Sequence, residues 1–216
     1  MLVIASAGVL AACAAGQSAD QDFPHADIAH VANVKSSFGP QFKVTSVGPT
    51  GIDPRLLGPQ KLPPGMTFDP ADCGKAASWQ VVPQGTKGNV AATTAEGDGN
   101  RFIAMAVETS EPVPATDPTP NCQKVGFTGR RVRGLVEVVE APQIEGVHTV
   151  GTHRVLQTTV DGKPLTGELY NYVARFGTFL VIVTANPLVL PGKPPAPVNT
   201  QRARDLLTAA VAAVEG

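Results

Sequence analysis

Strand-like runs separated by turn signals occupy the middle of this chain, and they constrain its fold more than any other feature. Residues 90–96 and 101–109 flank Gly97-Asp98-Gly99-Asn100, a sequence typical of a β-hairpin turn. Asp161-Gly162 is a second turn pair, of type I′. Further strands are predicted over residues 132–139, 149–160, 168–176 and 179–183. The last of these is the most continuous apolar run, so we expect it to be the central strand, buried on both faces.

Each end of this strand-rich region carries a helix signal. Asp27 is the expected cap of a first helix that ends at Gly39-Pro40 and whose apolar residues recur at helical spacing, at Ile28, Val31, Val34 and Phe38. Near the C-terminus, Asn199 or Thr200 caps a helix with one apolar stripe, formed by Ala203, Leu206, Leu207, Ala210, Val211 and Val214. The sequence therefore predicts an α+β fold, an antiparallel β-sheet with the N-terminal and C-terminal helices packed on it.

The connecting segments are rich in Pro and Gly. A strand is predicted over residues 42–47, followed by an ordered loop over 48–66 with one helical turn after Asp53-Pro54. Asp69-Pro70 predicts the start of a short helix that carries Cys73, with Asp at the cap and Pro at the first position. Residues 111–121 contain four Pro and are expected to form a surface loop that leads to Cys122.

The N-terminal residues predict export and a lipid anchor. A short apolar run ends in Leu10-Ala11-Ala12-Cys13, which resembles the bacterial lipobox, where the Cys is acylated and becomes the new N-terminus. The run is too short to span a bilayer, which takes about 20 apolar residues. It lacks the usual Lys or Arg, which a start codon further upstream would explain. The alternative is a buried N-terminal strand or helix in which Cys13 is an ordinary core residue.

The lipobox interpretation fixes the domain organisation and the location. Residues 1–13 are then a signal peptide ending in the lipobox Cys, residues 14–24 a flexible tether, and residues 25–216 a single α+β domain. Two or three acyl chains, palmitate among them, anchor more firmly than one. We therefore expect a lipoprotein on the extracytoplasmic face of the cell membrane, with the membrane as a partner through the anchor.

Cys73 and Cys122 are the two cysteines left once Cys13 is assigned to the anchor. In an exported chain such a pair is by default a disulfide, and a loop of about 50 residues predicts roughly 4 kcal/mol of stabilisation. Two free buried thiols are the alternative. A metal site is disfavoured because no His or further Cys lies at ligand spacing from either one.

Composition excludes some classes of function. The 216 residues, less leader and tether, suit one domain, and 22 Gly with 20 Pro suit turns and long loops better than a helical bundle. The net charge of −1 gives no field that would favour nucleic acid. We expect no nucleic-acid partner.

No catalytic, cofactor or metal motif stands out in the sequence. No Ser lies in a G-x-S-x-G elbow, and Gly97-Asp98-Gly99 opens onto a strand rather than onto a phosphate-binding helix. The four histidines are expected to be surface or satisfied polar residues rather than metal ligands: His25, His30, His148 and His153. We therefore expect no enzyme activity, no cofactor and no metal.

Two groups of residues are candidates for a binding surface. Arg130-Arg131-Val132-Arg133, with Lys124 nearby, is the one basic cluster, and it could face anionic lipid headgroups or cell-wall acids; a solvated strand end is the alternative. In the strand predicted over residues 168–176, two sets of side chains alternate along the chain. One set could line a cleft and the other the core, although Tyr inside paired strands is more often simple packing. These sets are Glu168, Tyr170 and Tyr172 against Leu169, Asn171 and Val173.

Several stretches of the chain look like a family of mycobacterial lipoproteins whose domain has no assigned function. They are residues 27–38, Gly51-Ile52-Asp53-Pro54-Arg55-Leu56-Leu57, Phe68-Asp69-Pro70-Ala71-Asp72-Cys73, Gly167-Glu168-Leu169-Tyr170-Asn171-Tyr172-Val173 and Arg202-Ala203-Arg204-Asp205-Leu206-Leu207. More distantly, the chain resembles the extracellular sensor domain of a mycobacterial Ser/Thr kinase of the PknH type. That resemblance implies an α+β fold with disulfides and a cleft for an unknown ligand. Such domains tend to have two disulfides, whereas this chain has Cys for one.

Two functions are consistent with these features. The first is a cell-envelope lipoprotein with a sensor-like, ligand-binding domain, whose small-molecule, lipid or cell-wall ligand lies in a cleft beside the sheet. The second is an interaction module that docks other envelope proteins, which a large exposed apolar patch would favour. The residues that would bind a ligand are not identified by the sequence.

Overall fold

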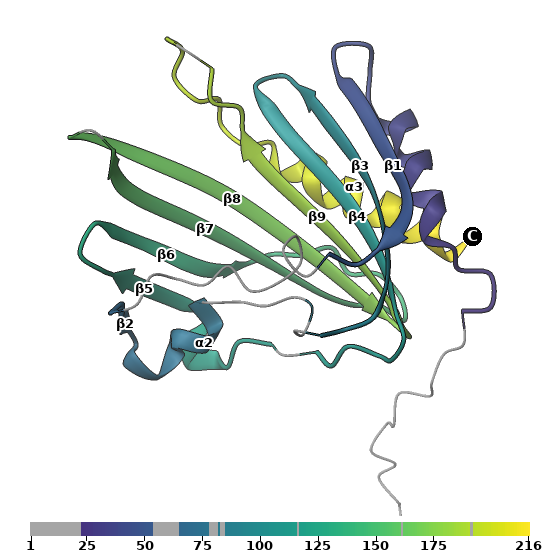
Figure 1. Ribbon diagram of the computed structural model, residues 1–216, viewed down its shortest axis with the longest axis horizontal. Helices are drawn as coiled ribbons and strands as arrows, with labels where there is room; N and C mark the ends of the chain where they lie inside the picture. The colour runs from purple at the N-terminus through teal and green to yellow at the C-terminus, as the bar shows by residue number, and fades with distance from the viewer. Residues whose placement is uncertain are drawn as a thin grey trace, which may run out of the picture.

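The computed structural model describes residues 23–53, 65–77, 82, 85–115, 117–160, 162–190 and 192–216. Within these residues the chain forms a nine-stranded antiparallel sheet with the strand order β1-β3-β4-β9-β8-β7-β6-β5-β2 (Figure 1). The strands are β1 (Lys43–Gly51), β2 (Thr67–Asp69), β3 (Gly88–Gly97), β4 (Asn100–Thr109), β5 (Lys124–Thr128), β6 (Val132–Val139), β7 (His148–Val160), β8 (Lys163–Phe176) and β9 (Phe179–Pro187). The predicted fold class is confirmed.

Two helices from opposite ends of the chain cover one face of this sheet. They are the 3-10 helix η1 (Ile28–Ser37) and the α-helix α3 (Thr200–Glu215), which pack on β1, β3, β4, β9 and β8 (Figure 1). The strands present buried side chains to them, among which small ones predominate: Ala91, Ala95, Phe102, Ala104, Ala106, Tyr172, Ala174, Val181, Val183 and Ala185. Such small residues let the helices lie close to the sheet, so this half of the face is a continuous apolar core.

The helix ends follow the sequence signals. The Asn199 side chain caps α3 by accepting a hydrogen bond from the backbone N–H of Arg202 at 3.0 Å, and all six residues of the predicted stripe are buried. Asp27 caps η1 in the same way, through the N–H of Ala29 at 2.7 Å. The first helix is nevertheless of the 3-10 type over its whole length. Its buried residues lie three apart in the sequence, which matches three residues per turn.

The first hairpin has the predicted turn. Asp98 and Gly99 join β3 to β4 with positive φ angles of 50° and 74°, as a type I′ turn requires. Phe102 points to the helix-bearing face, whereas Met105 and Val107 pack on the opposite face. The predicted central strand is β9, the fourth in the sheet, in which Phe179–Val183 are all buried.

The sequence did not predict β2 and β5, and one helix start was wrong. Asp69 does not cap a helix, because its backbone pairs with Gly126 as the last residue of β2. The short helix begins one residue after Pro70, as η2 (Ala71–Cys73), and continues as α2 (Gly74–Ala77). It does carry Cys73, as expected.

The disulfide between Cys73 and Cys122 is present, with an S–S distance of 1.99 Å across 49 residues. It joins η2 to the segment that leads into β5. Around it, Ala77, Val125, Phe127 and Val136 form a small buried cluster on the face opposite to α3. The disulfide therefore fastens η2 and α2 to the end of the sheet that is far from the two long helices (Figure 1).

Several predictions concern residues that lie outside the described part of the chain. They are the lipobox Cys13, the leader and nearly all of the tether, the helical turn after Asp53, and the first residue of the Asp161-Gly162 turn. The described chain begins at Phe23, whose ring packs edge-on against Phe176 with 5.0 Å between centroids. Packing thus starts two residues before the predicted domain boundary at His25. None of the helices in the described ranges has the length and apolar character needed to cross a membrane.

Candidate functional site

The helix-bearing face continues beyond α3 onto a part of the sheet where no helix of the described chain packs on this side, since η2 and α2 pack on the opposite face. Residues directly opposite each other in antiparallel strands point to the same face, so the register identifies this surface. We call it the bare half, and it comprises Thr67, Asp69, Lys124, Gly126, Thr128, Arg133, Leu135, Glu137, His153, Val155, Gln157, Thr166 and Glu168. None of these residues is buried, in contrast to the strand residues beneath α3 and η1. The bare half is therefore open to a ligand.

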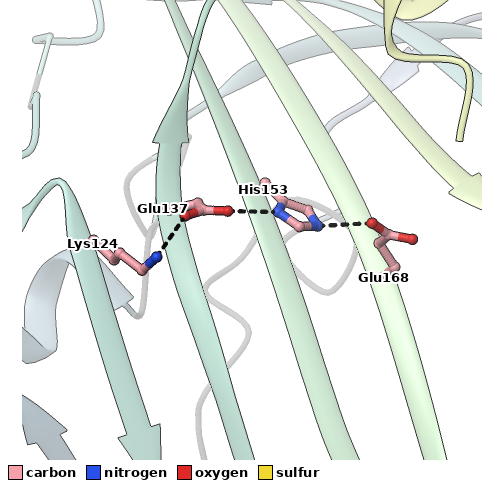
Figure 2. A network of polar contacts seen from close by, with 4 residues as sticks. All are labelled: Lys124, Glu137, His153 and Glu168. Carbon is pink, nitrogen blue, oxygen red and sulfur yellow. Dashed lines mark hydrogen bonds and ion pairs between the residues drawn. The ribbon is translucent and has the colours of Figure 1, made fainter.

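A line of four charged or ionisable side chains crosses the bare half from β5 to β8 (Figure 2). Lys124 Nζ lies 3.4 Å from Glu137 Oε2, and the other carboxylate oxygen of Glu137 lies 3.0 Å from His153 Nδ1. His153 Nε2 in turn lies 2.9 Å from Glu168 Oε1. We call these four residues the charge ladder. It ties four neighbouring strands together through side chains where no helix packs.

The nature of the two contacts of His153 depends on how many protons its ring carries. A neutral imidazole carries one N–H donor, but here both ring nitrogens face carboxylate oxygens, which only accept when ionised. Both contacts are therefore hydrogen bonds to ionised glutamates when the ring is doubly protonated. In that state Lys124, Glu137, His153 and Glu168 carry alternating charges that sum to zero. The hydrogen bond with His153, assisted by Lys124, lowers the pKa of Glu137.

Two tyrosines join the charge ladder to the core. The Tyr170 ring stacks on His153 at 4.2 Å with an interplanar angle of 11°, at the border of the apolar core. Burial raises the pKa of Tyr170, and Glu168 adds to this effect. Tyr172 is completely buried, and burial also raises the pKa of its hydroxyl. Glu168, Tyr170 and Tyr172, one of the two predicted sets on β8, thus share one face. Along the strand their side chains become progressively more buried, from the surface at Glu168 to the core at Tyr172.

Two adjoining hollows mark the rest of the bare half. The sheet hollow has a volume of about 480 Å³, and its floor includes Gly126, Leu135 and Val155. The arginine hollow, of about 380 Å³, lies at the β5–β6 turn and is lined by Arg130, Arg131 and Arg133. Thr128, Arg133 and Gln157 line both hollows. The predicted basic cluster therefore borders an open depression that continues onto an apolar stretch of the sheet.

The turn that carries the arginines is held at both ends. The N–H of Gly129 donates to the carbonyl of Val132 at 2.7 Å, and the hydroxyl of Thr158 donates to the carbonyl of Arg131 at 3.1 Å. A side chain at position 129 would collide with Met66, since a Cβ there would lie 2.4 Å from its sulfur. Arg133 Nε donates to Gln157 Oε1 at 2.7 Å, which orients its guanidinium. The arginines therefore project from a fixed turn.

The other predicted polar residues lie outside this surface. His148 Nε2 lies 2.8 Å from Asp117 in a partly exposed pair, which fits the satisfied polar role expected for it. His25 and His30 are exposed. On the face opposite to α3, Arg175 is buried, and its Nε and Nη1 atoms have no hydrogen-bond partner within the described chain. Burial lowers the pKa of its guanidinium, whereas the charge of Asp117 acts in the opposite direction.

Within the described ranges, no three His, Cys, Asp or Glu side chains are placed to hold a metal ion.

The sequence identified the arginines, Tyr170 and Glu168 as candidates, but it did not show that Glu137 and His153 lie beside Glu168. The predicted two-residue turn after Val160 did indicate how β7 pairs with β8. A two-residue connection places His153 opposite Tyr170, as observed. The pairing of His153 with Glu137 depends on the longer connection between β6 and β7, whose length sets no register.

Comparison with known proteins gives a family but no activity. Comparison with curated proteins finds no match. The structure resembles the X-ray structure of an uncharacterized protein, the Rv0999 ortholog, from Mycobacterium smegmatis. The TM-score is 0.86 at 64% identity, covering 90% of this chain and 100% of that one. It is only distantly similar to the extracellular domain of PknH from Mycobacterium tuberculosis, with a TM-score of 0.36 at 14% identity, covering 86% of this chain and 92% of the other.

A family model provides the assignment. The model named domain of unknown function DUF5642 matches residues 27–215, which is the whole span from the cap of η1 to the last residue of α3. The expected resemblance to a family without an assigned function is thereby confirmed. This chain belongs to the DUF5642 family.

Proposed function

We propose that this protein is an extracytoplasmic ligand-binding domain of the cell envelope, held at the membrane through a lipid on Cys13, and that its ligand binds on the bare half. The lipobox pattern supports the anchor. The Cys73–Cys122 disulfide supports an oxidising compartment outside the cytoplasm, because cytosolic proteins rarely keep such bonds. The binding function rests on the shape and chemistry of the bare half.

The observation that carries the proposal is the unequal cover of one sheet face. Apolar packing closes the strand surface under α3 and η1, and the hollow of about 510 Å³ on that side is lined by residues of the two helices and their ends, among them Phe38 and Arg202. The other half has two adjoining hollows that lie on the strands themselves. Ligand sites commonly combine an apolar surface with a few convergent polar groups, in volumes of roughly 300–1,000 Å³. Leu135 and Val155 supply the apolar surface here, with Gln157 and Thr128 beside them. A small amphiphilic molecule fits this lining.

A neutral fluorescent probe tests the binding surface. N-phenyl-1-naphthylamine is expected to bind the wild-type domain saturably, because Leu135 and Val155 offer an apolar surface in the sheet hollow. Leu135→Glu should weaken this binding by about tenfold or more, because the probe would then displace water from a carboxylate. Val47→Glu is the matched control, since Val47 is 62% exposed on edge strand β1, at the opposite edge of the sheet.

Two results would contradict the proposal: an absence of saturable binding, or equal losses in Leu135→Glu and Val47→Glu. When binding is confirmed, two extracts of the native host's envelope are tested as competitors. One is the chloroform–methanol extract and the other is the water-soluble extract. The extract that displaces the probe gives the class of the natural ligand, and failure of both extracts to displace it would also contradict the proposal.

Protein docking is a second candidate, favoured by exposed apolar residues at one end of the sheet. Val189 is 75% exposed, Leu165 49% and Leu190 44%. Leu165 lies near the start of β8, and Val189 and Leu190 follow the end of β9, so all three lie at the same end. A photo-crosslinking residue placed at Val189 or at Val155 separates the two functions in the native host. A specific protein adduct from position 189 alone would favour docking.

A further inference from the structure

We infer that the arginine hollow binds the phosphate group of the ligand. This inference rests on the proposed function, because it identifies the chemical class of molecule that the bare half takes. Arg130, Arg131 and Arg133 all line the hollow, together with side chains that are neutral: Thr128, Val132, Gln157, Thr158, Thr159, Pro164 and Thr166. Among the described residues, the lining thus contains cations and no carboxylate.

These three arginines differ from Lys124 and Arg101 in having no carboxylate partner within the described part of the chain. Lys124 pairs with Glu137, and Arg101 pairs with Glu96 at 2.7 Å. Arg130, Arg131 and Arg133 form no ion pair with any carboxylate of the described chain. The carboxylates of the adjoining charge ladder contact Lys124 and His153, and Asp69 in the sheet hollow forms no ion pair with the three arginines. The hollow is therefore a local concentration of positive charge on a chain whose net charge is −1.

The geometry suits a phosphate better than a single carboxylate. A guanidinium group presents a planar fork of N–H donors that pairs with two oxygens of a phosphate, and several such forks can share its oxygens. The hydroxyls of Thr128, Thr159 and Thr166 add neutral donors to the lining. Because the backbone of the turn is held by hydrogen bonds at Gly129 and Arg131, the backbone loses little conformational entropy when the arginines close on an anion.

The position of the hollow leaves two sources for the phosphate. The hollow includes Thr166 near the start of β8, whereas Phe23 packs against Phe176 at the end of that strand. At about 3.4 Å per residue, the hollow lies roughly 30 Å along the sheet from the place where the chain leaves the domain toward Cys13. A soluble sugar or glycerol phosphate reaches this site freely. A lipid headgroup would place its phosphate there and its apolar part along Leu135 and Val155 of the sheet hollow.

The test compares two variants that lose the same charge. The triple variant Arg130→Gln, Arg131→Gln, Arg133→Gln removes the cations of the hollow. The control variant Lys43→Gln, Lys87→Gln, Arg101→Gln removes three cations that do not line it. Each protein is titrated at low ionic strength with glycerol 1-phosphate and with acetate, followed by amide chemical shifts. Each is also titrated with phosphatidylcholine vesicles that either contain or lack phosphatidylinositol, followed by co-sedimentation.

We expect wild type to bind glycerol 1-phosphate or the phosphatidylinositol vesicles, and to bind acetate at least about tenfold more weakly. The hollow variant should lose about tenfold or more of the phosphate affinity, while the control variant stays within about twofold. Binding of glycerol 1-phosphate identifies a soluble source. Binding of the phosphatidylinositol vesicles without competition from glycerol 1-phosphate identifies a lipid source. Both results support the inference.

Three results would overturn it: no phosphate binding by wild type, equal losses in the two variants, or equal affinity for acetate and phosphate. The neutral probe N-phenyl-1-naphthylamine separates this failure from a failure of the proposed function. If the probe still binds in a Leu135-dependent manner, the bare half is a ligand site and only its phosphate specificity is wrong. Equal melting temperatures of the two variants exclude misfolding as the cause of any loss.

Discussion

The covered and the bare halves of the helix-bearing face belong to one continuous antiparallel sheet, but they are stabilised by different interactions. Under α3 and η1, positions such as Ala104, Val181 and Val183 are fully buried against the helices. At the equivalent positions of β6 and β7, the sheet presents Glu137, His153 and other partly exposed residues. Apolar packing closes the first half, whereas side-chain pairing holds the second half without covering it. A surface held in this way remains accessible to a ligand.

This contrast predicts where the stability of the fold resides. Burying one aliphatic side chain completely contributes roughly 1.5–3 kcal/mol, and α3 alone buries six apolar residues. Cross-strand polar pairs contribute about 0.2–1 kcal/mol each. The covered half should therefore supply most of the free energy of folding, and the bare half should tolerate substitutions that alter its chemistry.

The largest effect is expected from truncating a buried leucine on the covered side. Leu207→Ala should lower the free energy of unfolding by about 2–5 kcal/mol, because Leu207 is completely buried and its removal leaves a cavity under α3. Leu135→Ala makes the same chemical change on the bare half, where the side chain is already partly exposed. Its cost should stay below about 1 kcal/mol. Chemical denaturation of both variants measures the difference, and equal costs would show that the bare half is covered in solution.

The disulfide should come second in magnitude. Replacing Cys73 and Cys122 together by Ser is expected to lower the free energy of unfolding by about 2–4 kcal/mol, because the unfolded chain loses a constraint on a long loop. The single variant Cys73→Ser should also leave Cys122 open to alkylation. Hydrogen exchange should then rise in β2 and β5, which lie beside the disulfide, before it rises in β4 and β9.

Two controls accompany this measurement. Equal alkylation of both cysteines in unreduced wild-type protein would contradict the disulfide. A uniform rise of hydrogen exchange over all strands would instead show that the two halves unfold as one unit, so that the contrast between them does not extend to local stability.

Much of this architecture could be predicted from local patterns. The stripe of α3, the cap at Asn199 and the β3–β4 turn depend on residues close in sequence, and the structure confirms all three. The short strand β2 has only three residues, and β5 has a Gly at its centre, so their alternation was too brief to separate from the surrounding loops. Both strands exist because they pair with each other, and β5 also with β6. Tertiary pairing decides such segments.

The candidate site shows the same limit. The three arginines of the hollow lie within four residues of sequence, so their clustering was visible at once. The charge ladder brings together residues from four strands that are up to 44 positions apart, Lys124 to Glu168. Neither the order of the strands nor the register of β6 against β7 follows from local sequence. Only the β7–β8 part of the ladder followed from the two-residue turn.

The smallest expected effect concerns the pH dependence of the bare half. The pKa of Glu137 is lowered below its ordinary value of 4.5, first by the hydrogen bond with His153 and then by Lys124. A lowered pKa in the folded state means that the ionised group stabilises the fold above its ordinary pKa, and that this contribution is lost as the pH falls through the folded value. Glu137→Gln should therefore be less stable than wild type near neutral pH, by at most about 1 kcal/mol because the pair is partly exposed.

The two proteins should converge in stability as the pH falls through the lowered pKa of Glu137, because this side chain is then protonated in wild type as well. Thermal unfolding at a series of pH values measures this convergence. Glu145→Gln is a suitable control, because Glu145 is exposed in the loop between β6 and β7, away from the ladder. A constant difference between wild type and Glu137→Gln at all pH values would mean that the charge of Glu137 does not stabilise the bare half. The strands there would then be held by their backbone pairing and the disulfide alone.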